Sequence, residues 1–265
     1  MSQLHWLDTQ EIWFPPTSSA LKDPDGLLAA GGDLTPQRLV SAYSRGIFPW
    51  YSEGQPLLWW APDPRMVLRP KNLYFGRSLR KFLRKHPFRI TIDQEFETVM
   101  RQCGSVTRKD QDGSWITEEM IEAYSELHAL GIAHSVEAWQ DDELVGGLYG
   151  VALGRAYFGE SMYSVVSGAS KIAFSTLAQQ LNQWQFELID CQIQSEYLAS
   201  FGAIEISRHN FEHALSKAVG ANPQSAAEIP LAVRTVESDN LTIPILNWKQ
   251  AWQMPEKGYD GSDQT

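Results

Sequence analysis

Apolar and polar side chains alternate along three neighbouring segments in the middle of the chain: 134–139, 144–153 and 156–163. Alternation with a period of two is typical of β-strands that have one buried face. Short polar turns, 140–143 and 154–155, separate the segments. The pattern therefore predicts three consecutive antiparallel strands joined by tight turns.

Elsewhere, apolar residues recur every three or four positions, which predicts amphipathic helices. We expect helices over residues 36–45, 75–86, 93–103, 118–130, 169–181 and 209–218. Thr35 can cap the first helix, Pro36 suits its first turn, and Gly46 follows its end. The third helix is expected to begin through Thr91 or Asp93.

Three strands followed by a helix, a strand and a helix are an α+β order. We predict a small N-terminal domain (1–65), a main domain (66–220) and a C-terminal extension (221–265). The main domain resembles the N-acetyltransferase (GNAT-like) fold, in which a splayed, mainly antiparallel sheet holds an acyl donor. We expect a helical turn at 204–206 and an irregular extension whose end, 256–265, is disordered.

Coenzyme A does not suit this chain. An acetyltransferase needs a glycine-rich pyrophosphate loop at the start of the helix that follows the central strand, and Ser164–Lys171 contains only Gly168. Gly146 and Gly147 lie inside a strand segment, where glycine usually marks a bulge or close packing.

Composition excludes several classes of protein. Hydrophobic content of 43% and charged content of 20% over 265 residues are typical of a globular chain. Cys103 and Cys191 have no paired spacing, so neither a disulfide framework nor a zinc site is expected. No secretion signal and no apolar run near ~20 residues is visible. We expect a cytoplasmic protein that does not enter a membrane.

Basic residues are concentrated in one window. The net charge of −10 argues against general attraction to DNA. Residues 65–89, however, hold nine of the 22 Lys and Arg and no acid. The basic residues on the predicted helix 75–86 are Arg77, Arg80, Lys81, Arg84 and Lys85. Such a run is commonly a solvated surface, but the absence of acids favours phosphate binding.

Two carboxylates interrupt apolar strand segments. Asp190 lies in the middle of a predicted strand, 186–193, and alternation places Gln192 on the same face. Glu160 likewise shares a face with Met162. Two interpretations stay open: a polar site within the sheet, or acids that are each paired with an Arg or Lys for structural reasons.

Other candidate chemistry is weaker. His209 and His213 have helical i, i+4 spacing without a matching acid, which indicates a surface helix rather than a metal site. Ser161 lacks the Gly-x-Ser-x-Gly pattern of a hydrolase nucleophile. Cys191 is expected to be a buried structural thiol on the opposite face from Asp190.

Several motifs together resemble the bacterial leucyl/phenylalanyl-tRNA–protein transferases. The resemblance covers roughly residues 4–215, in the family's order. The matching segments are 31–36, 45–50, 59–65, 115–117, 133–137, 144–147, 159–162 and 189–192. It implies transfer of Leu, Phe or Met from aminoacyl-tRNA to a protein that begins with Arg or Lys. The donor is already an activated ester, so no metal or cofactor is expected. Nothing in the sequence requires a dimer, so we expect a monomer. The new N-terminus then marks the protein for degradation.

The resemblance also assigns roles to residues. Asp190, Gln192 and Glu160 match the reaction centre. Since a neutral amide is a very weak base, we expect Asp190 and Gln192 to orient the amine and Glu160 to attract the cationic acceptor. The remaining matches are Leu148, Met162, Leu177 and Ile189 for the donor side chain, Trp50 and Trp115 for the terminal adenine, and Arg77, Arg80, Lys81, Arg84 and Lys85 for tRNA phosphates.

The chain departs from the family pattern in places. Tyr197 stands where His is expected, Ser207 replaces Pro, and the segment after Gly220 is longer. Three alternatives stay open. They are a tRNA-dependent enzyme of peptidoglycan bridges, a tRNA-binding protein without catalysis, and a conventional acetyltransferase.

Overall fold

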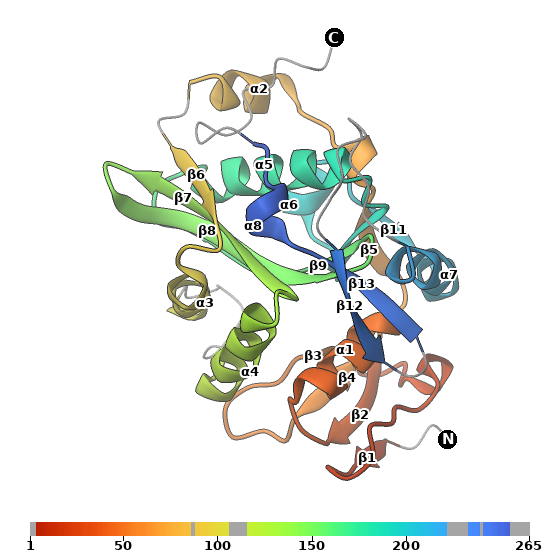
Figure 1. Cartoon of the computed structure of the whole chain (residues 1–265). Coiled ribbons are helices and arrows are strands. Elements are labelled where there is room, and N and C mark those ends of the chain that lie inside the picture. Colours follow the sequence, from red (N-terminus) through yellow and green to blue (C-terminus); the bar gives the residue numbers. More distant parts are fainter. Residues whose placement is uncertain (1–3, 86–87, 106–115, 222–232, 239–240, 255–265) are drawn as a thin grey trace.

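The N-terminal part of the chain folds around a small mixed sheet. The computed structural model describes residues 4–85, 88–105, 116–221, 233–238 and 241–254 (Figure 1). The sheet has the order β1-β2-β4-β3. Its elements are β1 (His5–Leu7), η1 (Thr17–Ser19), β2 (Leu27–Gly31), α1 (Pro36–Ser44), β3 (Phe48–Pro49) and β4 (Leu58–Trp60). Trp59 is fully buried within it, and Trp60 is half-buried.

Helix α1 begins at Pro36, as predicted, and Gly46 follows it with φ +77°. The predicted cap is wrong in its chemistry. Thr35 precedes the helix, but its hydroxyl donates to Asp33 Oδ1 (2.6 Å) and caps no helical N–H.

A seven-stranded sheet forms the centre of the molecule, in the order β11-β5-β10-β9-β8-β7-β6. Its strands are β5 (Arg65–Leu68), β6 (Arg89–Ile92), β7 (Ala133–Gln140), β8 (Glu143–Leu153), β9 (Ala156–Ser164), β10 (Leu188–Gln192) and β11 (Ile204–Ile206). The predicted antiparallel run β7-β8-β9 is confirmed, and among the described strands of this sheet only β9 and β10 pair in parallel. The expected helical turn at 204–206 is wrong. Two β-branched side chains flank Glu205, and this segment pairs with β5 as a strand.

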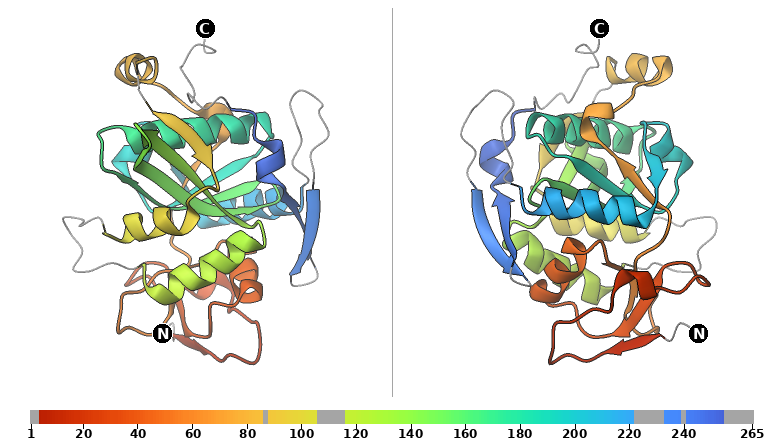
Figure 2. Two further views of the ribbon diagram at one scale, coloured as in Figure 1. Left: turned by 60° about the vertical axis from the view of Figure 1, so that its left-hand side comes forward. Right: turned by 90° about the vertical axis from the view of Figure 1, so that its right-hand side faces the viewer.

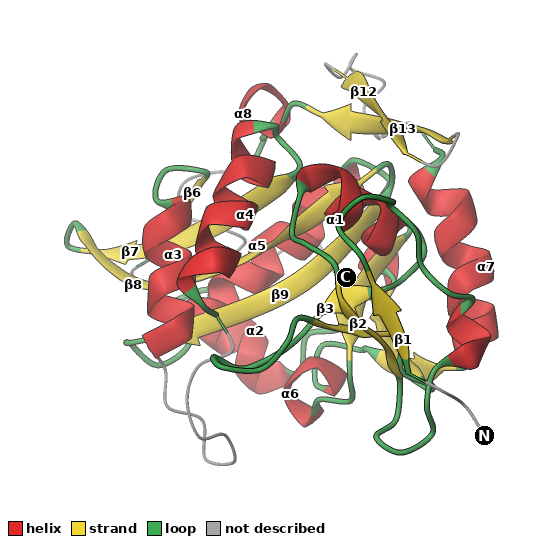
Figure 3. Cartoon of the chain, turned by 90° about the horizontal axis from the view of Figure 1, so that it is seen from below, coloured by secondary structure: helices red, strands yellow, loops and turns green. Residues whose placement is uncertain are grey.

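Helices cover both faces of this sheet (Figures 2 and 3). One face packs against α5 (Ala169–Gln183), with η2 (Pro70–Asn72) and α2 (Arg77–Leu83) beside it. The other face packs against α3 (Phe96–Ser105), α4 (Glu118–Ala129) and α7 (Arg208–Val219), while the short α6 (Glu196–Ala199) follows β10. Ser207 caps α7 by accepting from Asn210 N (3.3 Å), which explains how the chain starts this helix without proline.

Helix α3 begins later than predicted. Thr91 belongs to β6, and Asp93 has φ +52°, which excludes it from a helix. The N–H groups of Gln94 and Glu95 instead point to Glu137 Oε1 of β7, at 3.3 and 3.4 Å. A buried carboxylate from the sheet thus fixes where this helix starts.

The C-terminal extension is ordered over the described residues, which corrects the expectation of an irregular segment. It forms β12 (Val233–Ser238), β13 (Leu241–Leu246) and α8 (Trp248–Ala251). Trp248 is fully buried and stacks on His134 with ring centroids 4.0 Å apart. Trp184 Nε1 donates to Ala251 O (3.2 Å). Residues 256–265, expected to be disordered, lie outside the described part of the chain.

Glycines in β8 allow α5 to lie close to the sheet, as the sequence indicated. A Cβ at Gly146 would lie 2.5 Å from Ala169 Cβ, at the start of α5. Gly150 stands at an irregularity in the pairing of β8 with β9.

We expect Gly146→Ala to lower the free energy of unfolding by about 1–3 kcal/mol, because the new methyl group overpacks this contact. Chemical denaturation would measure the loss. Adding Ala169→Gly should recover part of it, because the clashing methyl is removed. A Gly146→Ala protein as stable as the parent would contradict the close packing.

Candidate active site

A cavity of about 480 Å³ opens where β9 and β10 separate. The two strands pair only between Ala156↔Leu188 and Phe158↔Asp190, although β9 continues to Ser164 and β10 to Gln192. Their unpaired ends diverge, and side chains from β3, α5 and α6 close the space between them. The splayed strands therefore create the cavity.

Each of these strands carries a bulge at the level of the cavity. Glu160 is the extra residue of β9 against β8, and Cys191 is the extra residue of β10 against β5. Gln192 follows with φ +63°. A bulge redirects side chains, so simple alternation does not describe this part of β10. Cys191 lines the cavity, and Asp190 and Gln192 have different side-chain partners.

Asp190 is fully buried and forms a bidentate ion pair with Arg65. Arg65 Nε lies 2.8 Å from Asp190 Oδ1, and Nη2 lies 2.6 Å from Oδ2. The guanidinium also lies between the rings of Phe48 and Phe211, 4.7 and 4.6 Å from their centroids. Asp190 Oδ1 accepts a further bond from Gln192 N (2.9 Å). Asp190 thus fits the interpretation of a paired acid, and it also fixes the backbone of Gln192.

Among the described residues, Glu160 has no such cationic partner. Its carboxylate accepts hydrogen bonds from Tyr43 Oη of α1 (2.8 Å), Tyr124 Oη of α4 (3.3 Å) and Gln192 Nε2 (3.0 Å). Loss of hydration raises the pKa of Glu160 to about 7; the tyrosine hydrogen bonds oppose this rise and the charge of Asp190 adds to it. Glu160 therefore exchanges a proton close to neutral pH.

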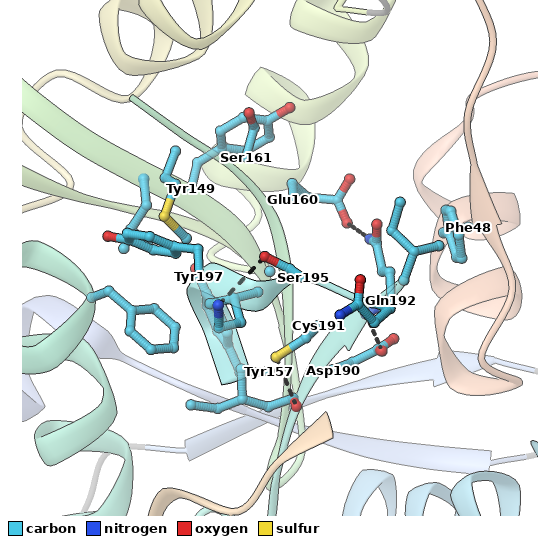
Figure 4. A pocket seen from close by; sticks show the side chains of 18 of the residues that line it. Phe48, Tyr149, Tyr157, Glu160, Ser161, Asp190, Cys191, Gln192, Ser195 and Tyr197 are labelled. Atoms are coloured by element: carbon cyan, nitrogen blue, oxygen red, sulfur yellow. Dashed lines mark hydrogen bonds between the residues drawn. The ribbon is translucent and has the colours of Figure 1, made fainter. Parts of the chain in front are cut away.

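The hydrogen bond to Glu160 also orients Gln192 (Figure 4). Its NH2 group faces the carboxylate, so its carbonyl oxygen Oε1 is left as an acceptor. Among the described residues, Oε1 has no hydrogen-bond partner. The cavity thus combines a titratable carboxylate with an available amide oxygen.

An apolar surface lies beside this polar end. Leu148, Met162 and Ile189, three of the four residues predicted to contact the donor side chain, line the cavity. Leu177 is fully buried but does not line it; Phe174, about one turn earlier on α5, does. The register of the strands explains why the three strand residues, Leu148, Met162 and Ile189, line the cavity. The sequence did not show which turn of α5 faces the cavity.

Aromatic residues stand at the edge of the cavity. Trp50 lines it and is half-buried, with its ring 5.5 Å from that of Trp60. Trp115, the expected partner in holding an adenine, lies outside the described residues. Tyr197 also lines the cavity, and its hydroxyl lies 3.2 Å from Ser170 Oγ.

The predicted basic helix is present but shorter than expected. α2 ends at Leu83, and Arg84 and Lys85 form the turn after it. Its apolar side packs inward through Leu83, with Leu79 and Phe82 partly buried beside it. Within the described residues none of the five basic side chains has an acidic partner. The cluster lies outside the cavity lining, although Phe82 packs against Gly168 at the start of α5.

Three residues near the cavity were missed in the sequence: Arg65, Tyr43 and Tyr124. Arg65 alone left a signal, because it is a cation directly before the apolar run 66–68. The tyrosines occupy ordinary core positions of amphipathic helices, and nothing in their spacing indicates contact with Glu160.

A separate cluster outside the cavity, Asp93, His128 and His134, has ligand-type atoms within 4.8 Å of one another. His134 Nδ1 lies 2.8 Å from Asp93 Oδ2, and its Nε2 lies 3.2 Å from Gly131 O. Although burial opposes ionisation, His134 and Ser135 N hold the pKa of Asp93 below its ordinary value. Both ring nitrogens already bind oxygen, so these contacts suit a structural ion pair rather than a metal.

In the described part of the chain, every helix is too short or too polar to cross a membrane.

Comparison with known proteins gives a consistent result. The family model described as leucyl/phenylalanyl-tRNA protein transferase matches residues 67–216, and the model of that family's N-terminal domain matches 32–63. A solved structure of a functionally unknown conserved protein from Staphylococcus epidermidis is 10% identical, with a TM-score of 0.37 over 68% of each chain. That similarity is too low to support an argument.

Relatives named leucyl/phenylalanyl-tRNA–protein transferase match much more of the sequence. The one from Teredinibacter turnerae is 59% identical over 97% of this chain and 99% of its own length. The one from Saccharophagus degradans is 53% identical over the same shares. The one from Nitrosospira multiformis is 58% identical over 81% of this chain and 91% of its own length. The chain belongs to the leucyl/phenylalanyl-tRNA–protein transferase family.

Proposed function

We propose that this chain transfers Leu, Phe or Met from aminoacyl-tRNA to the N-terminal Arg or Lys of a protein. The observation that carries the proposal is the cavity, in which an apolar wall meets Glu160 and the free amide oxygen of Gln192. A peptide bond forms, tRNA leaves, and the new N-terminus marks the protein for degradation. The enzyme acts as a cytoplasmic monomer.

The proposal includes a GNAT-like fold for the main domain. The parallel strands β9 and β10, which splay at paired bulges around the cavity, support it. The division into domains 1–65 and 66–220 is supported by the two sheets, which share no strand.

The donor binds with its side chain against Leu148, Met162, Ile189 and Phe174. Flexible Met162 adapts to apolar side chains of different shape, which suits Leu, Phe and Met. Trp50, with Trp115, holds the terminal adenine. The basic residues of α2 and its following turn bind phosphates, so salt should weaken tRNA binding strongly.

The reaction needs alignment more than strong acid or base chemistry. The donor is an activated ester, and an unperturbed α-amine has a pKa of about 7.7–8.0, so a useful fraction is neutral near pH 7. Gln192 Oε1 accepts an N–H of the attacking amine, and the Glu160 carboxylate attracts the cationic acceptor. The ribose 2′-hydroxyl relays the proton to the leaving oxygen. Asp190 and Arg65 act as positioning residues because both are buried beneath Gln192.

Transfer of labelled Leu from Leu-tRNA tests the function. We expect product with a peptide that begins with Arg and none with the matched peptide that begins with Ala, since only the former carries a cationic side chain for Glu160. A protein that binds tRNA without transfer to either peptide would contradict the proposal.

Glu160 predicts a pH dependence. Because its raised pKa is about 7, the carboxylate becomes ionised as pH rises through 7, and acceptor kcat/KM should rise there. Glu160→Gln should remove this lower step and keep the rise near pH 8 from the amine itself. Measurements from pH 5.5 to 9 with an N-terminal Arg peptide would show it. An identical profile in both proteins would exclude titration of Glu160.

Asp190→Asn should lower kcat far more than it weakens aminoacyl-tRNA binding. The new amide places an N–H2 group against Arg65, so the side chain loses either Arg65 or the Gln192 N–H. The free energy of unfolding should also fall by about 3–5 kcal/mol, because a buried cation is left unpaired. Kinetics and chemical denaturation measure the two effects.

The double variant Arg65→Met/Asp190→Asn separates stability from positioning. It leaves no unpaired buried charge, so stability should largely return while turnover stays low. Unchanged turnover in folded Asp190→Asn would remove Asp190 from the mechanism.

A further inference from the structure

A second cavity, of about 990 Å³, lies at the opposite end of β10 from the candidate active site. Its walls are the end of β5, η2, the turn before β9, the end of α5, the start of β10, β11 and one side of α7. On α7, Asn210, His213, Ala214 and Lys217 line it at i, i+3, i+4 and i+7, so a single helical face forms that wall. We call this cavity the distal groove.

The distal groove is strongly basic on an acidic protein. The described residues of its lining include Arg69, Lys71, Arg155 and Lys217 but a single acid, Glu187. Arg155 lies 3.3 Å from Glu187, so these two charges balance. Arg69, Lys71 and Lys217 are exposed, and among the described residues none has an acidic partner. Three unbalanced cations therefore face the groove, on a chain of net charge −10.

Neutral hydrogen-bonding groups surround these cations. Asn72, Asn182, Gln185 and Asn210 line the groove and offer amide donors. Such a mixture of cations and amides suits phosphate and sugar oxygens.

The distal groove and the candidate active site lie close together in the fold. β10 has five residues, so the parts of the two linings at its two ends lie roughly 15 Å apart at 3.3 Å per residue. The chain from α6 to β11 passes between them, since Glu196–Leu198 line the active site and Gly202 and Ile204 line the groove. Lys71 also lies six residues before Arg77 of the basic helix.

We propose that the distal groove binds the phosphate backbone of the aminoacyl-tRNA body while the esterified 3′ end occupies the active site. This inference rests on the proposed function. A nucleic acid carries a phosphate at every nucleotide, so its backbone can contact several cations that are spread along a groove. The acceptor protein does not need this groove for recognition, because its cationic N-terminal residue is already recognised by Glu160 in the proposed function. The groove thus lengthens the basic surface beyond α2.

The double variant Lys71→Ala/Lys217→Ala tests the proposal in the full-length chain. Each lost phosphate contact reduces the slope of log K against log salt by about 0.7–0.9. Between 50 and 200 mM salt, tRNA affinity should therefore fall about tenfold less in the variant than in the parent. At low salt, KM for Leu-tRNA should rise about tenfold with unchanged kcat. Lys22→Ala/Lys249→Ala, which removes two exposed lysines outside the groove, is the charge-matched control.

A minimal donor, Leu esterified to adenosine, separates the groove from the active site. Its kinetics should be equal in the parent and the double variant, because it cannot reach the groove. If the double variant had the same salt slope and the same KM for tRNA as the parent, the proposal about the groove would be overturned. The proposed function would still stand in that case, provided that the parent transfers Leu. An equal loss with the minimal donor, or a change confined to KM of the protein acceptor, would also overturn it. Failure of the parent to transfer Leu would instead count against the proposed function, and the tRNA-binding slopes would still decide the role of the groove.

Discussion

The ion pair between Arg65 and Asp190 joins most of the elements that build the active site. Arg65 begins β5, Asp190 lies in β10, and the guanidinium is enclosed by rings from β3 and α7. Burial of two charges is costly unless geometry is close to ideal. Here the bidentate contact and the two aromatic faces provide that geometry. The N-terminal sheet, the central sheet and α7 must all be in place before the charges are satisfied.

The two carboxylates of the site illustrate how environment separates chemically similar groups. Asp190 is buried and paired with the cation of Arg65. Glu160, among the described residues, accepts hydrogen bonds from neutral donors only, and its pKa is raised to about 7. Tyr43 reaches Glu160 from α1 and Tyr124 from α4. The N-terminal part of the chain thus contributes directly to the electrostatics of the cavity.

Local periodicity was enough to predict much of the fold, including β7 to β9, α1, α4, α5 and α7. It could not predict β5, β6 or β11, because these short strands depend on partners far along the chain. β12 and β13 were also missed, although they pair with each other and only two residues separate them in the sequence. For the site, strand register brought Glu160, Met162 and Asp190 to one cavity. The bulges at Glu160 and Cys191, and the partners Arg65 and Tyr43, arise from tertiary contacts that no spacing encodes.

The position of Trp248 has a consequence for the order in which the protein is made. The ribosome synthesises Asp190 and Gln192 about sixty residues before Trp248, yet Trp248 fills the space between His134, Tyr157 and Trp184 of the main domain. Until that late segment emerges, these rings lack the surface that covers them. The apolar interior is therefore completed only after α8 has been synthesised, and a nascent protein truncated at the end of α7 would expose an aromatic surface to water.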